Sequence, residues 1–215
     1  MKKITAVTVI ALTAAVLTLA QSCRRGEPDE TAKETVALPQ PVSADYGTEW
    51  AYAGMDRQIP SDDNDFAVTG SGFVYRDGWL GTDGDGYFDL ACLREPGSEE
   101  SFTLCFDAYT EGDGFLRIGL WLYSVDSLPG DGSGGVWLSY FDGLISDNGE
   151  SRTIPKGAAS VRVQMDAPGQ RLRVYVNGDL VIERACAPEN GGGAVKIISG
   201  KGPAFISNAA FRMGI

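Results

Sequence analysis

From Tyr46 onward, short stretches in which every second residue is apolar alternate with clusters of Gly, Asp, Ser and Asn. A period of two is that of a strand with one buried and one exposed face, and the clusters are typical of turns. No segment has a long helical period. The pattern predicts an all-β chain folded as a two-sheet antiparallel sandwich. The expected strands cover 66–75, 79–81, 87–93, 101–109, 115–124, 136–141, 159–166, 171–176, 180–184, 194–198 and 204–213.

The alternation divides each strand into two faces, and the apolar faces should meet as a core between the sheets. The expected core residues include Phe102, Leu104, Phe106 and Ala108, then Ile118, Leu120 and Leu122, then Val136, Leu138 and Tyr140. The opposite faces carry polar and aromatic side chains.

The hairpin at Asn177-Gly178 can be paired in two ways. A two-residue turn puts apolar residues opposite Asp179 and Glu183, whereas a three-residue loop pairs Val174 with Ile182. Because register follows burial, we expect the three-residue loop.

The first residues form an export signal: Lys2 and Lys3, an apolar run over 4–20, and small residues before Cys23. The cysteine at the cut point resembles a bacterial lipoprotein box, which implies a signal peptide over 1–22 and lipidation of Cys23. The alternative is an ordinary secretory signal cut near residues 20–22. Residues 23–45, rich in charge and proline, are expected to form a flexible tether to a sandwich over 46–215. This predicts a bacterial cell-envelope protein, anchored to a membrane by lipid, with its domain outside the cytoplasm.

Composition excludes several function classes. Without residues 1–22, 16 basic and 29 acidic residues leave a net charge of −13, which argues against a nucleic-acid partner. The chain has no histidine, and therefore no Ser-His-Asp triad or histidine-ligated zinc. With Cys23 lipidated, Cys92, Cys105 and Cys186 leave at least one thiol outside any internal disulfide, and a Cys92–Cys105 bridge is disfavoured because their side chains face opposite ways.

Four segments together resemble concanavalin A-like, laminin G-like jelly-roll domains. They are ASVRVQMDAPGQRLRVYVNGDLVIE (159–183), SFTLCFDA (101–108), the stretch 66–80 with Asp77-Gly78-Trp79-Leu80, and the closing strand 206–212. The resemblance implies a jelly-roll sandwich over about 60–215. Its superfamily includes carbohydrate-binding modules, glycosidases, sialidase-associated domains and adhesion modules, so fold alone does not settle function. The Glu-x-Asp-x-x-Glu motif of one enzymatic branch is absent, and Asp107 is the only acid within its strand.

The faces opposite the core supply the candidate ligand-binding site, if the strands neighbour one another as the resemblance implies. Exposed aromatic side chains can stack on sugar rings, while Asp, Arg and Ser hydrogen-bond hydroxyl groups. The alternative is that Trp121 and Trp137 pack under loops or in a second part of the core. The predicted site residues are Asp107, Tyr109, Arg117, Trp121, Tyr123, Trp137, Ser139, Arg173 and Tyr175.

Two further kinds of site have weaker signals. Asp83 and Asp85 offer oxygens of the kind that Ca²⁺ takes, although Asp-Gly runs are also ordinary turns. Glycoside hydrolysis needs two carboxyl groups about 5–9 Å apart, and near Asp107 the nearest acids, Glu111 and Asp113, lie in a glycine-rich turn.

These observations predict a lipid-anchored sandwich that binds a ligand, with glycan as the leading partner, without catalysis and with no cofactor unless it is Ca²⁺. The first alternative is a glycoside hydrolase-related enzyme. The second is an adhesion or assembly module that binds an envelope protein.

Overall fold

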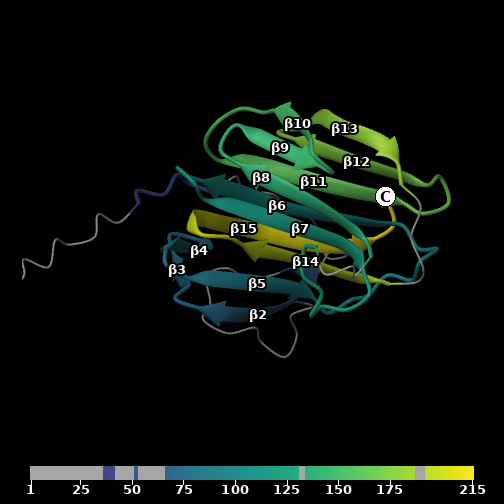
Figure 1. Ribbon diagram of the computed structural model, residues 1–215, viewed down its shortest axis with the longest axis horizontal. Coiled ribbons are helices and arrows are strands. Elements are labelled where there is room, and N and C mark those ends of the chain that lie inside the picture. Colours follow the sequence, from purple (N-terminus) through teal and green to yellow (C-terminus); the bar gives the residue numbers. More distant parts are fainter. Residues whose placement is uncertain (1–35, 42–50, 53–65, 131–133, 187–191) are drawn as a thin grey trace, which may run out of the picture. The chain divides into compact units, whose positions relative to one another are not determined.

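The computed structural model describes residues 36–41, 51–52, 66–130, 134–186 and 192–215. All regular structure in these residues is β-strand, in two antiparallel sheets that pack face to face (Figure 1). Sheet A has the order β13 (Asp179–Ala185), β12 (Arg171–Val176), β11 (Ala159–Asp166), β6 (Phe102–Thr110), β15 (Gly202–Met213), β4 (Trp79–Gly84) and β3 (Val74–Arg76), and β1 (Ala51–Tyr52) pairs with β15. Sheet B has the order β10 (Glu150–Thr153), β9 (Leu144–Asp147), β8 (Val136–Phe141), β7 (Phe115–Leu122), β14 (Ala194–Ser199), β5 (Tyr87–Cys92) and β2 (Phe66–Ser71). The predicted two-sheet antiparallel sandwich is confirmed.

The core lies between the sheets, as the alternation predicts. Phe102, Leu104 and Phe106 from β6 join Ile118 from β7 and Leu138 from β8 in one cluster of buried side chains. Complete burial of each such side chain stabilises the fold by about 1.5–3 kcal/mol.

The alternation fails near the end of β7. Lys196 of β14 pairs with Gly119 and Ala194 pairs with Leu122, so Leu120 and Trp121 together oppose the single residue between Lys196 and Ala194. This is a β-bulge, and Trp121 has a backbone φ of 53° within it. The extra residue turns Trp121 inward, where it is 1 % exposed and packs edge-on against Phe102. The prediction that Trp121 lies on an exposed face is therefore wrong, and the alternative of a core position is correct.

The hairpin between β12 and β13 combines both of the pairings that we considered. Its turn has two residues, since Val176 pairs with Asp179 and both Asn177 and Gly178 have positive φ. The expected three-residue loop is thus wrong. A bulge after Val174 then shifts the register so that Val174 pairs with Ile182, as burial requires.

The segment 36–41, within the predicted tether, belongs to the same compact unit as the sandwich. The Arg76 guanidinium donates a hydrogen bond to the Val36 carbonyl, and the Trp79 indole N–H donates one to the Pro39 carbonyl, each at 2.8 Å. The predicted signal peptide and Cys23 lie outside the described residues. Within the described ranges, no helix has the length and apolar character needed to span a bilayer.

Among the described residues, the three cysteines Cys92, Cys105 and Cys186 are buried. Cys92 lies in sheet B and faces the core, whereas Cys105 lies in sheet A and faces away from it. Burial raises the pKa of the Cys105 thiol to about 11.

Candidate functional site

Seven of the nine predicted ligand-binding residues divide between the outer sides of two different sheets. Asp107 and Tyr109 on β6 lie in sheet A with Arg173 and Tyr175 on β12. Three others, Arg117 on β7 with Trp137 and Ser139 on β8, lie in sheet B. Tyr123 follows β7 and is half exposed, and Trp121 is in the core. The prediction that all nine gather on one surface is wrong because β6 and β12 are not in the sheet of β7 and β8.

The sheet A group is engaged in contacts within the protein. Asp107 is fully buried and accepts a hydrogen bond from the Asn208 amide at 2.7 Å, so it cannot meet a ligand at the surface. Arg173 donates to Glu183 at 2.9 Å. The Arg162 guanidinium covers the Tyr175 ring at 4.2 Å from its centroid.

Tyr109 belongs to an aromatic cluster on the same side of sheet A. Its ring lies 6.4 Å from the Trp79 ring and 6.3 Å from the Phe205 ring, centroid to centroid. The Arg76 guanidinium lies 5.3 Å from the Phe205 ring, and Trp79 is hydrogen-bonded to the segment 36–41. Burial and the nearby Glu111 carboxylate raise the pKa of Tyr109. This cluster packs against its own chain.

The outer face of sheet B has a different character. Across β7 and β8, Phe115 pairs with Phe141, Arg117 with Ser139, and Gly119 with Trp137. We call Phe115, Arg117, Trp137, Ser139 and Phe141 the Trp137 face. All five side chains are only partly buried. Because Gly119 has no side chain, the Trp137 indole lies across it: a Cβ at Gly119 would stand 2.8 Å from the indole carbons.

Hydrogen-bonding groups lie between the aromatic ends of the Trp137 face. Trp137 and Phe141 are four residues apart on one strand, a separation of about 13 Å. Arg117 and Ser139 lie between them, with the Arg117 guanidinium 5.6 Å from the Phe115 ring centroid. Within the described residues Arg117 forms no ion pair and its Nε has no hydrogen-bond partner. That Nε is itself enclosed, so the Trp137 face offers partly exposed aromatic surface beside the Arg117 side chain and the Ser139 hydroxyl.

A buried lysine holds the loop after β7 beside this face. Lys196 pairs with Gly119 in register, and only 1 % of it is exposed. Its Nζ donates to the Asp89 carboxylate at 2.9 Å and to the Val125 carbonyl at 2.6 Å. Burial raises the pKa of Asp89, and the bond from Lys196 opposes that shift. The Val125 carbonyl of the loop is therefore tied to β14 at the position that pairs with Gly119.

Sequence reasoning missed four of these residues. Phe115 is two residues from Arg117, and Phe141 is two residues from Ser139. Because every second residue of a strand lies on the same face, the alternation already predicted that both phenylalanines lie on the outer face. Asp89 and Lys196 are 107 residues apart in sequence, and no local pattern predicts that they pair.

The predicted calcium ligands do not form a cluster. The Asp83 carboxylate accepts a hydrogen bond from Arg76 at 2.7 Å, and Asp85 is exposed. No three acidic, cysteine or histidine side chains converge as potential ligands in the part of the chain that the structure describes. Calcium binding stays a prediction, which ligand binding measured with added Ca²⁺ and with EDTA would test.

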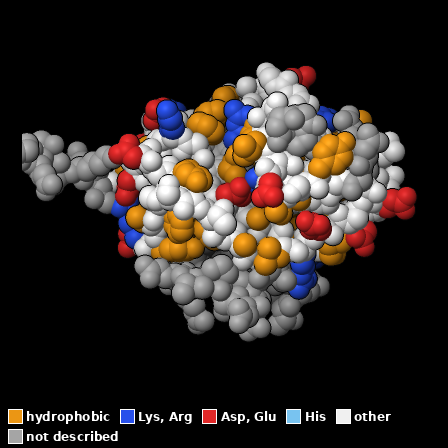
Figure 2. Space-filling model, turned by 60° about the horizontal axis from the view of Figure 1, so that its bottom comes forward, with side chains coloured by type: hydrophobic (Ala, Val, Ile, Leu, Met, Phe, Trp, Pro, Cys, Tyr) orange, Lys and Arg blue, Asp and Glu red, His pale blue; other side chains and the backbone are white. Residues whose placement is uncertain are grey.

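Figure 2 turns the β2 side of Figure 1 forward. On the face in view, hydrophobic side chains form several small groups separated by polar and charged surface. Small scattered apolar groups are ordinary on protein surfaces and do not by themselves mark a binding site.

Comparisons with known proteins bear on the fold. Neither protein-family models nor curated protein sequences match the chain. The carbohydrate recognition domain of Emp47p has a TM-score of 0.61 at 12 % identity, covering 84 % of this chain and 100 % of that one. The potassium-bound carbohydrate recognition domain of Emp46p has a TM-score of 0.59 at 10 % identity, covering 77 % and 97 %.

A plant protein has the same architecture: the Lotus tetragonolobus seed lectin matches with a TM-score of 0.52 at 14 % identity, covering 73 % of this chain and 96 % of that one. At these identities the likeness concerns the fold alone. The metal-free form of the Emp46p carbohydrate recognition domain also matches, with a TM-score of 0.57 at 9 % identity, covering 74 % of this chain and 94 % of that one. The two antiparallel sheets of this chain form a concanavalin A-like jelly-roll sandwich.

Proposed function

We propose that this protein binds carbohydrate on the Trp137 face without catalysing a reaction on it. The observation that carries the proposal is the partly exposed Trp137 side chain across Gly119, on the face that also carries Arg117 and Ser139. An aromatic ring covers the apolar face of a sugar, while Arg117 and Ser139 hydrogen-bond its hydroxyl groups. The likeness to carbohydrate recognition domains and to a lectin supports the same ligand class.

A glycan array with the purified protein tests this proposal, followed by titration of the best glycan. Trp137→Ala should lower the affinity at least about 10-fold, because buried tryptophans dominate many binding sites. Tyr175→Ala is the matched control, since it removes an aromatic ring from the outer face of the other sheet, and it should bind like the wild type. The absence of binding to all plant, host and bacterial glycans on the array would contradict the proposal. Unchanged glycan affinity of Trp137→Ala would also contradict it. A stable complex with an envelope protein and no sugar binding would favour the adhesion or assembly alternative.

The position of Asp107 supports binding without catalysis. A glycosidase needs a pair of carboxyl groups that reach the scissile bond. Asp107 is fully buried and held by Asn208, and therefore has no access to a glycan on either outer face. We expect the protein to release no reducing sugar from the glycans it binds. Release that Asp107→Asn abolishes would establish the hydrolase alternative.

We further propose that Cys23 is lipidated and anchors the protein to a membrane of the bacterial envelope, with the sandwich outside the cytoplasm. The charged and apolar pattern of residues 2–23 supports this anchor. Cys23→Ser should move the protein from the membrane fraction to the soluble fraction, and globomycin should block processing of the wild type. Unchanged partitioning of Cys23→Ser would contradict the anchor.

A further inference from the structure

A short segment with two prolines, residues 36–41, packs against β3 and β4 of sheet A. Its sequence is VALPQP. Proline fixes its own φ near about −65°, and the residue before a proline avoids the helical region, so residues 38–41 favour the polyproline II conformation. This conformation has no internal hydrogen bonds and leaves its carbonyl groups free for other donors. Among the described residues, no backbone–backbone hydrogen bond involves this segment.

The burial of the segment repeats every three residues. Ala37 and Gln40 are exposed, whereas the other four residues are partly buried. Because a polyproline II helix has three residues per turn, residues three apart lie along one edge. One edge therefore faces the solvent, and the other two are covered. The two carbonyls that accept hydrogen bonds from the sheet, those of Val36 and Pro39, are also three residues apart.

The surface under the segment combines aromatic rings with two hydrogen-bond donors. We call it the Trp79 platform, which consists of Arg76, Gly78, Trp79, Tyr109 and Phe205. The Trp79 indole N–H donates to the Pro39 carbonyl and the Arg76 guanidinium donates to the Val36 carbonyl, each at 2.8 Å. Pro41 lies over Gly78, where a Cβ would stand 3.2 Å from the Pro41 ring.

The donor of Arg76 is held in place by its other contacts. Its Nη2 also donates to the Asp83 carboxylate at 2.7 Å, and its guanidinium lies 5.3 Å from the Phe205 ring centroid. The Tyr109 ring lies beside both Trp79 and Phe205. Aromatic surfaces of this kind recognise proline-rich peptides, because a polyproline II peptide loses little conformational entropy when it binds.

We propose that the Trp79 platform is a recognition site for proline-containing peptides in the polyproline II conformation, and that residues 36–41 occupy it as a releasable strap. The two donors of the platform meet carbonyl groups that are one turn of such a peptide apart. A peptide of the same chemistry on another chain competes with the strap for these donors. The site lies on sheet A and is independent of the Trp137 face, which lies on sheet B.

Nitrogen-15 NMR of the full-length protein tests the strap through the Trp79 indole N–H. Pro39→Ala combined with Pro41→Ala removes both rings and keeps the accepting carbonyls, so the indole N–H should exchange with water at least about fivefold faster. Gln40→Ala is the matched control, because it places the same residue on the exposed edge, and its exchange rate should stay within about twofold of the wild type. Equal exchange rates in the two variants would overturn the proposal.

A peptide titration then tests recognition between chains. The probe is the acetylated, amidated peptide VALPQP, and the control peptide has glycine in place of both prolines. The probe should shift the Trp79 signal of the double variant in a saturable way, with at least about fivefold higher affinity than the control peptide, because glycine removes the preformed backbone. The wild type should need at least about 10-fold more probe, since its own strap competes at an effective concentration on the order of millimolar.

The absence of a saturable Trp79 shift in the double variant would overturn the proposal. Equal affinity of the two peptides would refute recognition of the polyproline II conformation, and equal affinity of the wild type and the variant would refute occupation of the platform by the strap. If the double variant does not fold, Pro41→Ala alone serves for both experiments, because it removes only the ring over Gly78.

Discussion

Lys196 is a buried cation on the outer side of sheet B, and two oxygens hold its ammonium group. Removal of one partner of a buried ion pair leaves the other charge uncompensated, which destabilises a protein by about 3–5 kcal/mol when burial is complete. Asp89 retains 22 % side-chain exposure, so we expect a smaller loss.

Lys196→Met should therefore lower the free energy of unfolding by about 2–3 kcal/mol, measured by urea denaturation. It should also loosen the loop around Val125. Lys156→Met is the matched control, because the Lys156 side chain is 80 % exposed and its only described ion pair is 4.0 Å long. That variant should stay within about 0.5 kcal/mol of the wild type. Equal stability of the two variants would show that the Lys196 contacts do not stabilise the fold.

At the scale of single elements, bulges and turns decide which side chains reach the core. The bulge in β7 moves Trp121 inward, while the regular β8 leaves Trp137 outside. In the β12–β13 hairpin a bulge compensates for the short Asn177-Gly178 turn, so that Ile182 still reaches the core. Each strand thus keeps its apolar face buried by a local change of register.

The turn of that hairpin requires a positive φ of 89° at Gly178, and nothing lies within 4 Å of a Cβ built there. Gly178→Ala should lower the free energy of unfolding by about 1–2 kcal/mol, entirely through backbone strain. Gly178→Asn should cost less, because asparagine adopts this conformation more readily. Thermal unfolding of both variants measures the difference. Equal losses would mean that the positive φ is not the cause.

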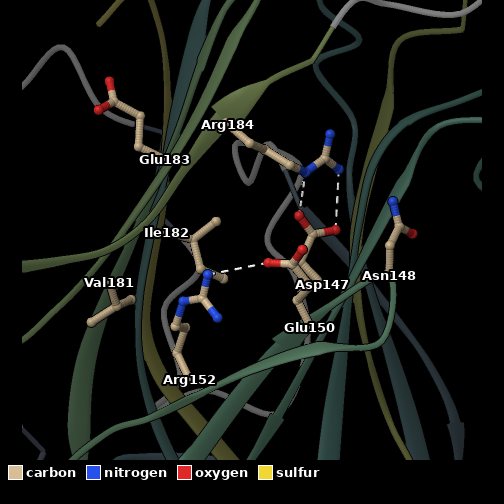
Figure 3. A pocket seen from close by; sticks show the side chains of 8 residues that line it. All are labelled: Asp147, Asn148, Glu150, Arg152, Val181, Ile182, Glu183 and Arg184. Atoms are coloured by element: carbon tan, nitrogen blue, oxygen red, sulfur yellow. Dashed lines mark hydrogen bonds and ion pairs between the residues drawn. The ribbon is translucent and has the colours of Figure 1, made fainter.

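At the scale of the whole sandwich, the Arg184–Asp147 ion pair joins β13 of sheet A to β9 of sheet B. Asp147 is buried whereas the Arg184 side chain is 32 % exposed, so the pair is partly shielded from water (Figure 3). A double-mutant cycle with Arg184→Met and Asp147→Asn should give a coupling energy of about 1–3 kcal/mol in denaturant unfolding. The Glu150–Arg152 pair lies within one exposed hairpin and should give less than about 0.5 kcal/mol. Similar coupling in the two cycles would contradict a role of the Arg184–Asp147 pair in holding the sheets together.

The alternation of β6 and β8 was sufficient to predict their buried faces, because a strand with a period of two shows only one face to the core. The same reasoning placed Trp137 and Ser139 on an outer face correctly. It failed for Trp121, since a bulge adds one residue without any change in the local pattern. It also failed for Asp107, whose burial depends on Asn208 from a strand 101 residues away.

The sequence by itself determined that the chain forms strands, which side of most strands is buried, and hence a two-layer antiparallel sandwich. Those properties follow from local chemistry, since the period of side chains and the residues of turns act over a few neighbours. Only the tertiary structure decided that β6 and β7 belong to different sheets, that Lys196 meets Asp89, and that Trp121 turns into the core. Such features depend on contacts between residues about 100 positions apart, and the packing of complete sheets selects those contacts.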